Sequence, residues 1–314
     1  GLDVWHSRSM TVISSFRQPG IVCTNHVIDV PLDHANPDGP QIEVFAREVV
    51  GADMFTANGR LKEELPWLVF LQGGPGGRAG RPLGRMDWLD RALKSYRVVL
   101  LDQRGTGHST PANRQTLATL GSPAEQAAYL RHFRADSIVR DAELVRSHLI
   151  GPAEPWSALG QSYGGFCAMS YLSLVPEGLR EAFVTGGLAP IDGHPDQVYR
   201  ATYPRVEDKN AAFFARYPED RDRVDRIAEH LRTHDVRLPN GDQLTVRRFQ
   251  MMGMSLGDSM AFHQLHYTLE DAFVASDAGP ELSDIFLRAV DSRVSFGDGP
   301  LYAVLHEPIY CQGE

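Results

Sequence analysis

The sequence has few cysteines, no long apolar run and no excess of positive charge, and each shortage argues against a class of protein. Cys23, Cys167 and Cys311 are far apart, and their spacing is neither that of a metal site nor that of a disulfide framework. A chain without such a framework fits a reducing cytoplasm, where we expect the protein. No apolar stretch approaches the length that crosses a bilayer, and the first residues lack the pattern of a signal peptide, so we expect no membrane partner.

The charge balance is acidic. Lysine and arginine total 31 and aspartate and glutamate total 40, which gives a formal net charge of −9. A nucleic-acid-binding domain would carry a basic face, so we expect no nucleic-acid partner. Hydrophobic residues make up 42% of the 314 residues, enough for a sizeable core in one large domain or two modest ones.

The most informative segment is Gly-Gln-Ser-Tyr-Gly at 160–164, which has the form G-x-S-x-G. Residues 156–159 predict a short buried strand before it, and residues 163–175 predict an apolar helix after it. A serine at such a strand-to-helix turn adopts a strained backbone and directs its hydroxyl away from the sheet. The pattern alone also occurs by chance, but in this setting we interpret Ser162 as a catalytic nucleophile.

A glycine cluster at 73–77 follows a second apolar strand at 67–71. Glycines let backbone N–H groups face a ligand, and in acyl transfer such groups stabilise the developing oxyanion. We predict that the N–H groups of Gly74 and Tyr163 do so here. The cluster could also be a flexible turn or a nucleotide loop. A phosphate loop needs a lysine that is missing, and a dinucleotide fingerprint fails because Ala79 takes the place of its last glycine.

A third segment, at 97–109, joins another apolar strand to a polar, glycine-bearing loop. Buried Asp and Arg side chains near a site usually brace loops by hydrogen bonds and ion pairs. We therefore predict that Asp102 and Arg104 are structural and are neither the acid nor the base.

The ordered motifs resemble those of a known family. Gly-Gly-Pro-Gly-Gly at 73–77, Asp-Gln-Arg-Gly-x-Gly-x-Ser at 102–109 and Gly-Gln-Ser-Tyr-Gly-Gly at 160–165 together resemble the proline iminopeptidases, α/β-hydrolases that cleave an N-terminal proline from peptides. Val-Pro-Leu-Asp-His at 30–34 resembles the opening of the larger members. One departure is Gln72, where the family usually has histidine. Both side chains can brace the loop by hydrogen bonds.

The resemblance extends over nearly the whole chain and implies its organisation. We expect an α/β-hydrolase core with a mostly parallel sheet at 1–187, led by a β-hairpin, and a mainly helical inserted cap at 188–314. In this family the triad's Asp and His follow the cap. We therefore expect both beyond Glu314, and we expect the C-terminal part of the core to be absent from this chain.

Three histidines are candidates for a local substitute for the expected base. His263 and His266 are three residues apart, and His306 precedes a glutamate. A histidine on a helical stretch is more often packed or solvated than a base, and the pair lacks a third ligand at metal spacing. We expect no metal and no cofactor.

The remaining pattern alternates strands and helices, which indicates the α/β class. We predict strands and helices at these places: strands at 21–31, 41–50, 97–102 and 182–185, a helix from Pro123 capped by Ser122, a helix with Ile138, Ala142, Val145 and Leu149 on one face, and cap helices within 206–235, 257–275 and 281–292.

Glu307 lies in the apolar, aromatic stretch 305–310. By the resemblance, the cap supplies glutamates that hold the substrate's ammonium group, and Glu307 falls where one is expected. It could equally be a surface carboxylate at a helix end.

The resemblance implies a serine aminopeptidase that releases an N-terminal residue, above all proline, from a small peptide with a free N-terminus through an acyl-enzyme. Two further hypotheses stay open: an esterase or tripeptidyl aminopeptidase on the same fold, and a non-catalytic α/β-hydrolase-like binding protein.

Overall fold

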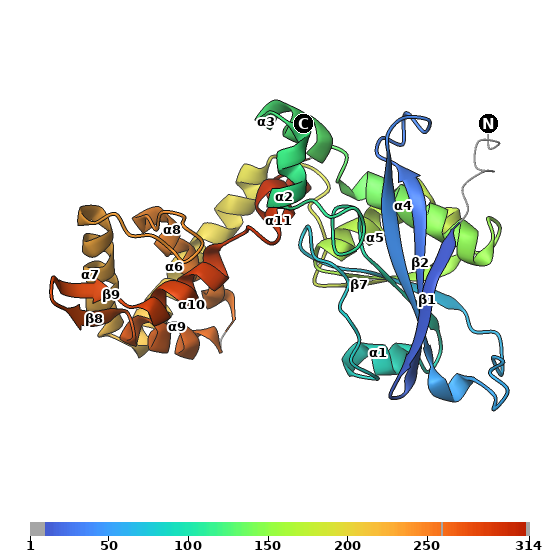
Figure 1. The fold of residues 1–314 in the computed structure, drawn as a ribbon, viewed down its shortest axis with the longest axis horizontal. Helices are drawn as coiled ribbons and strands as arrows, with labels where there is room; N and C mark the ends of the chain where they lie inside the picture. Colours follow the sequence, from blue (N-terminus) through green and yellow to red (C-terminus); the bar gives the residue numbers. More distant parts are fainter. Residues whose placement is uncertain (1–9, 259, 312–314) are drawn as a thin grey trace. The chain divides into compact units, whose positions relative to one another are not determined.

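The computed structural model describes residues 10–258 and 260–311 (Figure 1). The described residues divide into two compact units, one of residues 10–193 with 297–311 and the other within residues 194–296. The second unit is shorter at both ends than the predicted cap at 188–314. It begins only at residue 194, and it ends at residue 296 because the chain then returns to the first unit. The division into a catalytic core and a cap stays a prediction.

A seven-stranded sheet organises the first unit, in the order β1-β2-β3-β5-β4-β6-β7. Its strands are Thr11–Gln18, Ile21–Pro31, Gln41–Gly51, Trp67–Leu71, Arg97–Leu101, Trp156–Gln161 and Leu179–Thr185, numbered β1 to β7. The first three pair antiparallel, β3 pairs antiparallel with β5, and β5, β4, β6 and β7 are parallel. The predicted hairpin and mostly parallel sheet are confirmed. Strand β1 is not among the predicted elements; it is an edge strand whose side chains are mostly exposed.

The central strands are buried on both faces, which explains their continuous apolar runs. In β4, Leu68 and Phe70 pack toward α1 (Asp87–Ala92). Val69 and Leu71 pack toward α4 (Ala135–Ile150) and α5 (Tyr163–Leu174). Helices α4 and α5 lie side by side on their face of the sheet (Figure 1).

Two helix predictions in the first unit are confirmed in detail. Helix α3 (Pro123–Leu130) begins at a capping box, in which the Ser122 hydroxyl accepts from the Glu125 N–H and the Glu125 carboxylate accepts from the Ser122 N–H. In α4, the predicted face is buried at Ile138, Ala142 and Val145. The unit also contains α2 (Arg114–Leu117), α11 (Pro300–Leu305) and 3-10 turns at 52–54, 118–120, 176–178 and 308–310, the last of which is η5.

The second unit is mainly helical and has its own core. Its helices are α6 (Pro195–Arg216), α7 (Asp220–Thr233), α8 (Val246–Gln250), α9 (Ala261–Glu270) and α10 (Asp284–Val294), with a 3-10 stretch at 251–257. Phe213, Ile227 and Phe286 are among the side chains that fill this core. Within the described ranges, no helix is both long and apolar enough to cross a membrane.

One helix prediction in this unit is partly wrong. The pattern predicts helix over 257–275, but α9 covers only Ala261–Glu270. The following residues form β8 (Phe273–Ser276), which pairs antiparallel with β9 (Gly279–Leu282). The short Phe-Val-Ala-Ser segment satisfies its backbone groups across this hairpin, a pairing that a helical period does not reveal.

Candidate active site

Ser162 lies at the turn between β6 and α5, as predicted. Its backbone has φ 56° and ψ −123°, a region that non-glycine residues enter only under strain. It is half-buried, and among the described residues its hydroxyl has no hydrogen-bond partner. The turn therefore holds a serine hydroxyl in a strained, unengaged position at the N-terminus of a helix.

Glycines are required around this turn because the backbone segments nearly touch. A Cβ on Gly160 would stand 2.2 Å from the Gly164 oxygen, and one on Gly164 would stand 1.8 Å from the Leu71 oxygen. A Cβ on Gly187 would stand 1.9 Å from the Ser162 oxygen. These distances exclude any side chain, so both glycines of the G-x-S-x-G motif are explained by close approach of strand, helix and loop.

The glycine loop that follows β4 lies against the serine. Leu71 and Gly160 are partners in the parallel register, so β4 and β6 end at the same edge of the sheet. A Cβ on Gly73 would stand 2.8 Å from the Ser162 Cβ. Gly74 has φ 127°, which favours glycine. The structure thus brings together the two loops in which the sequence pattern places the nucleophile and the oxyanion donors.

The two predicted donors have backbone settings that suit the role. Tyr163 is the first residue of α5, and the first N–H groups of a helix lack intrahelical acceptors. The Gly73 carbonyl accepts from the Gly77 N–H at 3.2 Å. This bond orients the peptide group that carries the Gly74 N–H. In the described part of the chain, neither the Gly74 nor the Tyr163 N–H has an acceptor.

Asp102 braces the loops around this site, as predicted. Its side chain is fully buried, and its two oxygens accept from the Arg81 guanidinium at 2.8 and 2.6 Å. It also accepts from the N–H groups of Ala79 and His108 at 3.2 and 2.9 Å. Four hydrogen bonds to one carboxylate join the two loops, and none of the donors is the imidazole that a triad acid would orient.

Arg104 has the same structural character. Its buried guanidinium donates to both oxygens of Asp141, at 2.7 and 2.6 Å, and to the carbonyls of Leu32, His132 and Pro31. His34 also bonds Asp141 at 2.8 Å and lies 3.0 Å from the guanidinium. This Asp–His pair is therefore part of a packing network.

Residues 300–310 belong to the first unit and pack on the glycine loop and on α5. A Cβ on Gly76 would stand 2.7 Å from the Leu301 Cβ, so α11 lies directly on the glycine loop. The Tyr310 ring lies 5.8 Å from that of Phe166, in the first turns of α5. Glu307, between them, is exposed and precedes η5. The structure thus places Glu307 in a segment that packs on the loops of the site, within the first unit and not the second.

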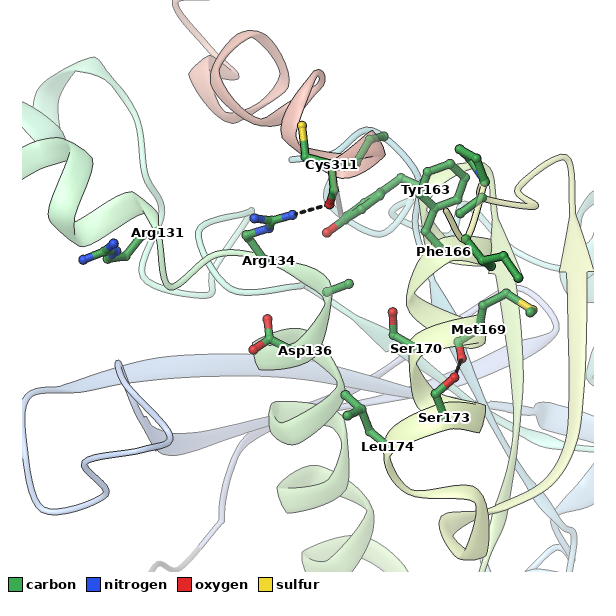
Figure 2. Close-up of a pocket in the computed structure, with 15 residues that line it drawn as sticks. Arg131, Arg134, Asp136, Tyr163, Phe166, Met169, Ser170, Ser173, Leu174 and Cys311 are labelled. Atoms are coloured by element: carbon green, nitrogen blue, oxygen red, sulfur yellow. Dashed lines mark hydrogen bonds between the residues drawn. The ribbon is translucent and has the colours of Figure 1, made fainter. Parts of the chain in front are cut away.

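A cavity of about 670 Å³ adjoins the turn (Figure 2). Tyr163, Phe166 and Met169 of α5 line one side, and Arg134 donates to the Cys311 carbonyl across it at 3.1 Å. Ser162 is not in its lining, so we assign no substrate site to it. Burial raises the pKa of the Tyr163 phenol well above its usual range, so this lining group stays neutral.

The comparisons with known proteins agree with this geometry. The family described as the alpha/beta hydrolase fold matches residues 66–276. A proline iminopeptidase from Aeromonas sobria is 54% identical over 94% of this chain and 67% of its own length. Another, from Aspergillus aculeatus, is 39% identical over 91% of this chain and 63% of its own length.

The chain belongs to the proline iminopeptidase family of α/β hydrolases. It spans about two thirds of the length of these two relatives. A solved α/β-fold hydrolase from Bacillus anthracis aligns with 86% of this chain and 73% of its own at 14% identity, with a TM-score of 0.35.

Of the three histidines considered as local bases, two are engaged in the second unit and the third is partly buried in the first. In the second unit, His266 bonds Asp220 at 2.8 Å through Nδ1, with its Nε2 3.4 Å from Glu270, and His263 bonds the Tyr217 hydroxyl at 2.5 Å. His306 belongs to the first unit, where burial lowers its pKa. We identify none of the three as the triad base of this proline iminopeptidase family member.

Two residues that contact the site are not among those predicted from the sequence. Gln103, within the Asp102–Ser109 motif, bonds the glycine loop, and Leu301 packs on it. The contact of Gln103 could have been predicted, because Gln103 lies close after a buried strand and between the bracing residues Asp102 and Arg104. The contact of Leu301 could not have been predicted, since an apolar residue in a helix has many possible partners.

Proposed function

We propose that this member of the proline iminopeptidase family is a serine aminopeptidase that releases an N-terminal proline from peptides. The observation that carries the proposal is the position of Ser162, strained at the N-terminus of α5 with the Gly73 backbone against its Cβ. A strained serine beside free backbone N–H groups is the arrangement that acyl transfer requires.

In the proposed reaction, the Ser162 hydroxyl attacks the first peptide carbonyl. A histidine takes the proton of the hydroxyl, and an aspartate orients this histidine. We propose that both residues lie beyond Glu314. The Gly74 and Tyr163 N–H groups bind the oxyanion of the tetrahedral intermediate. Its collapse transfers the proton to the leaving amine, and water then hydrolyses the prolyl-enzyme.

We propose that Glu307 binds the free ammonium group of the substrate. Two features support this: Glu307 is an exposed residue, and its segment packs on both the glycine loop and α5. Anchoring the ammonium fixes the distance from the N-terminus to the reacting carbonyl, so cleavage falls after the first residue. The cytoplasmic location stays a prediction from the cysteine pattern.

The test is Ser162→Ala in the full-length protein. We expect the variant to stay folded and to lose turnover of proline p-nitroanilide and labelling by a fluorophosphonate. Retained turnover would reject Ser162 as nucleophile, and an unlabelled, inactive wild-type protein would favour a non-catalytic binding protein. Faster cleavage of tripeptide nitroanilides would indicate a tripeptidyl aminopeptidase, and faster cleavage of a short acyl ester would indicate an esterase.

A further inference from the structure

Besides Asp102, a second buried side chain of the Asp102–Ser109 motif, that of Gln103, joins this motif to the glycine loop. Gln103 is 2% exposed, and its Nε2 donates to the Gln72 carbonyl at 2.8 Å. The Gln103 carbonyl in turn accepts from the Thr106 N–H at 3.0 Å and from the Thr106 hydroxyl at 2.7 Å. Gln103 is thus held in its own loop and reaches into the neighbouring one.

The Gln72–Gly73 peptide group is fixed at both of its polar ends. Its carbonyl accepts from Gln103, and its N–H donates to the Gln72 Oε1 at 2.8 Å. A peptide group is planar, so the bond from Gln103, which belongs to another loop, restricts its rotation, whereas the bond to Oε1 is local to Gln72. The next peptide group carries the Gly74 N–H, and its carbonyl is held by Gly77. The direction of the Gly74 N–H therefore depends on a short series of fixed peptide groups that begins at Gln103.

The orientation of the Gln103 amide follows from the same contacts. Its Oε1 is buried and, within residues 10–311 apart from 259, has no hydrogen-bond partner. Exchanging the amide nitrogen and oxygen would place two acceptors 2.8 Å apart and lose the bond to Gln72. The amide is therefore oriented by its bond to the Gln72 carbonyl.

Given the peptidase function proposed above, we infer that Gln103 is a positioning residue for the oxyanion donor at Gly74. It acts through the Gln72–Gly73 peptide group and does not touch the substrate. A loosened peptide group would misdirect the Gly74 N–H where negative charge develops, while ground-state binding at Glu307 is unaffected. The loss should therefore appear in kcat and not in KM.

The test compares Gln103→Met and Gln103→Glu in the full-length protein with proline p-nitroanilide. Methionine keeps the length and removes the donor. We expect kcat to fall about 10- to 100-fold with KM within about twofold of wild type, because one donor is misaligned and not deleted. Gln115→Met is the matched control, since Gln115 is exposed in α2, and it should leave kcat unchanged.

Gln103→Glu tests the positioning role through the pH dependence of kcat, which would not change if Gln103 were merely structural. As a carboxylate it cannot donate to the Gln72 carbonyl, whereas as a carboxylic acid it can. Its kcat relative to wild type at the same pH should therefore recover as the pH is lowered, and the Gln103→Met ratio should stay flat. This variant also keeps the test valid if Gln103→Met fails to fold.

The outcomes separate the two proposals. An active wild type with folded Gln103 variants of unchanged kcat would overturn the positioning role alone. So would a rise in KM with constant kcat, or a Gln103→Glu ratio that does not change with pH. A wild-type protein that neither turns over the substrate nor labels with fluorophosphonate would overturn the peptidase proposal itself.

Discussion

The Cβ of Ser162 lies over the backbone of Gly73, so closely that a side chain on Gly73 would begin 2.8 Å from it. Gly73 has no positive φ that would itself require glycine, so close contacts with Ser162 and with the Gln161 carbonyl, at 3.0 Å, exclude larger residues there. The Ser162 turn and the glycine loop therefore pack so closely that no methyl group fits at Gly73.

This contact predicts the effect of Gly73→Ala. The added methyl group must push the glycine loop away from Ser162 and, in the proposed reaction, displace the Gly74 N–H from the oxyanion. We expect kcat for proline p-nitroanilide to fall on the order of 10²- to 10³-fold, the effect of losing one oxyanion donor. Gly80→Ala is the control, because a Cβ on Gly80 has no atom within 4 Å. Equal activity of the two variants would contradict the close contact.

The proposed ammonium anchor predicts a selective effect of Glu307→Gln. The amide keeps the size of the side chain and removes its charge, so substrates with a free amine should lose binding and simple esters should not. We expect KM for proline p-nitroanilide to rise about tenfold or more, with little change in KM for a short acyl ester. Glu177→Gln, at another exposed glutamate of the first unit, should change neither. Parallel changes with both substrates would remove the anchor.

A buried ion cluster on the sheet predicts a pH-dependent contribution to stability. Glu48 of β3 bonds His26 at 3.1 Å and Arg97 at 3.0 Å. Burial opposes ionisation of Glu48, but these partners outweigh it, and its pKa lies below the ordinary value of 4.5. A lowered carboxyl pKa contributes stability that is present above that ordinary value and is lost as the pH falls through the folded-state pKa.

Glu48→Gln should therefore lower the free energy of unfolding by about 2 kcal/mol at pH 7, since it weakens hydrogen bonds to charged groups. The difference from wild type should shrink as the pH falls below 4.5. Urea unfolding at pH 7 and at a pH below 4.5 measures this difference in the free energy of unfolding. Glu43→Gln, on an exposed position of the same strand, is the control. A difference that is the same at both pH values would contradict the assignment.

Much of the first unit could be predicted because its signals are local. The residues that form β4 and β5 are continuous apolar runs, the cap at Ser122 is a short-range motif, and the serine turn lies within a strand–turn–helix pattern. Each depends on residues a few positions apart. The ordered motifs then point to the family, which the comparisons show.

The errors and omissions arise where the deciding partner is distant in the chain or the segment is short. The β8–β9 hairpin lies where the pattern predicts helix, because a four-residue strand has too few positions to show its period. The role of Leu301 is invisible in the sequence because Gly76 and Gly105, which it contacts, lie in two other loops. A Cβ on Gly105 would stand 2.8 Å from the Leu301 Cδ1.

The sequence by itself determined the strained serine, the glycines beside it and the alternation of strands and helices, since these follow from backbone geometry and short-range periodicity. Only the tertiary structure decided that the Gln103 amide holds the Gln72 carbonyl and that residues 297–311 return to pack with the first unit. Such contacts depend on how folded elements are placed in space, and neither propensity nor spacing along the chain records that placement.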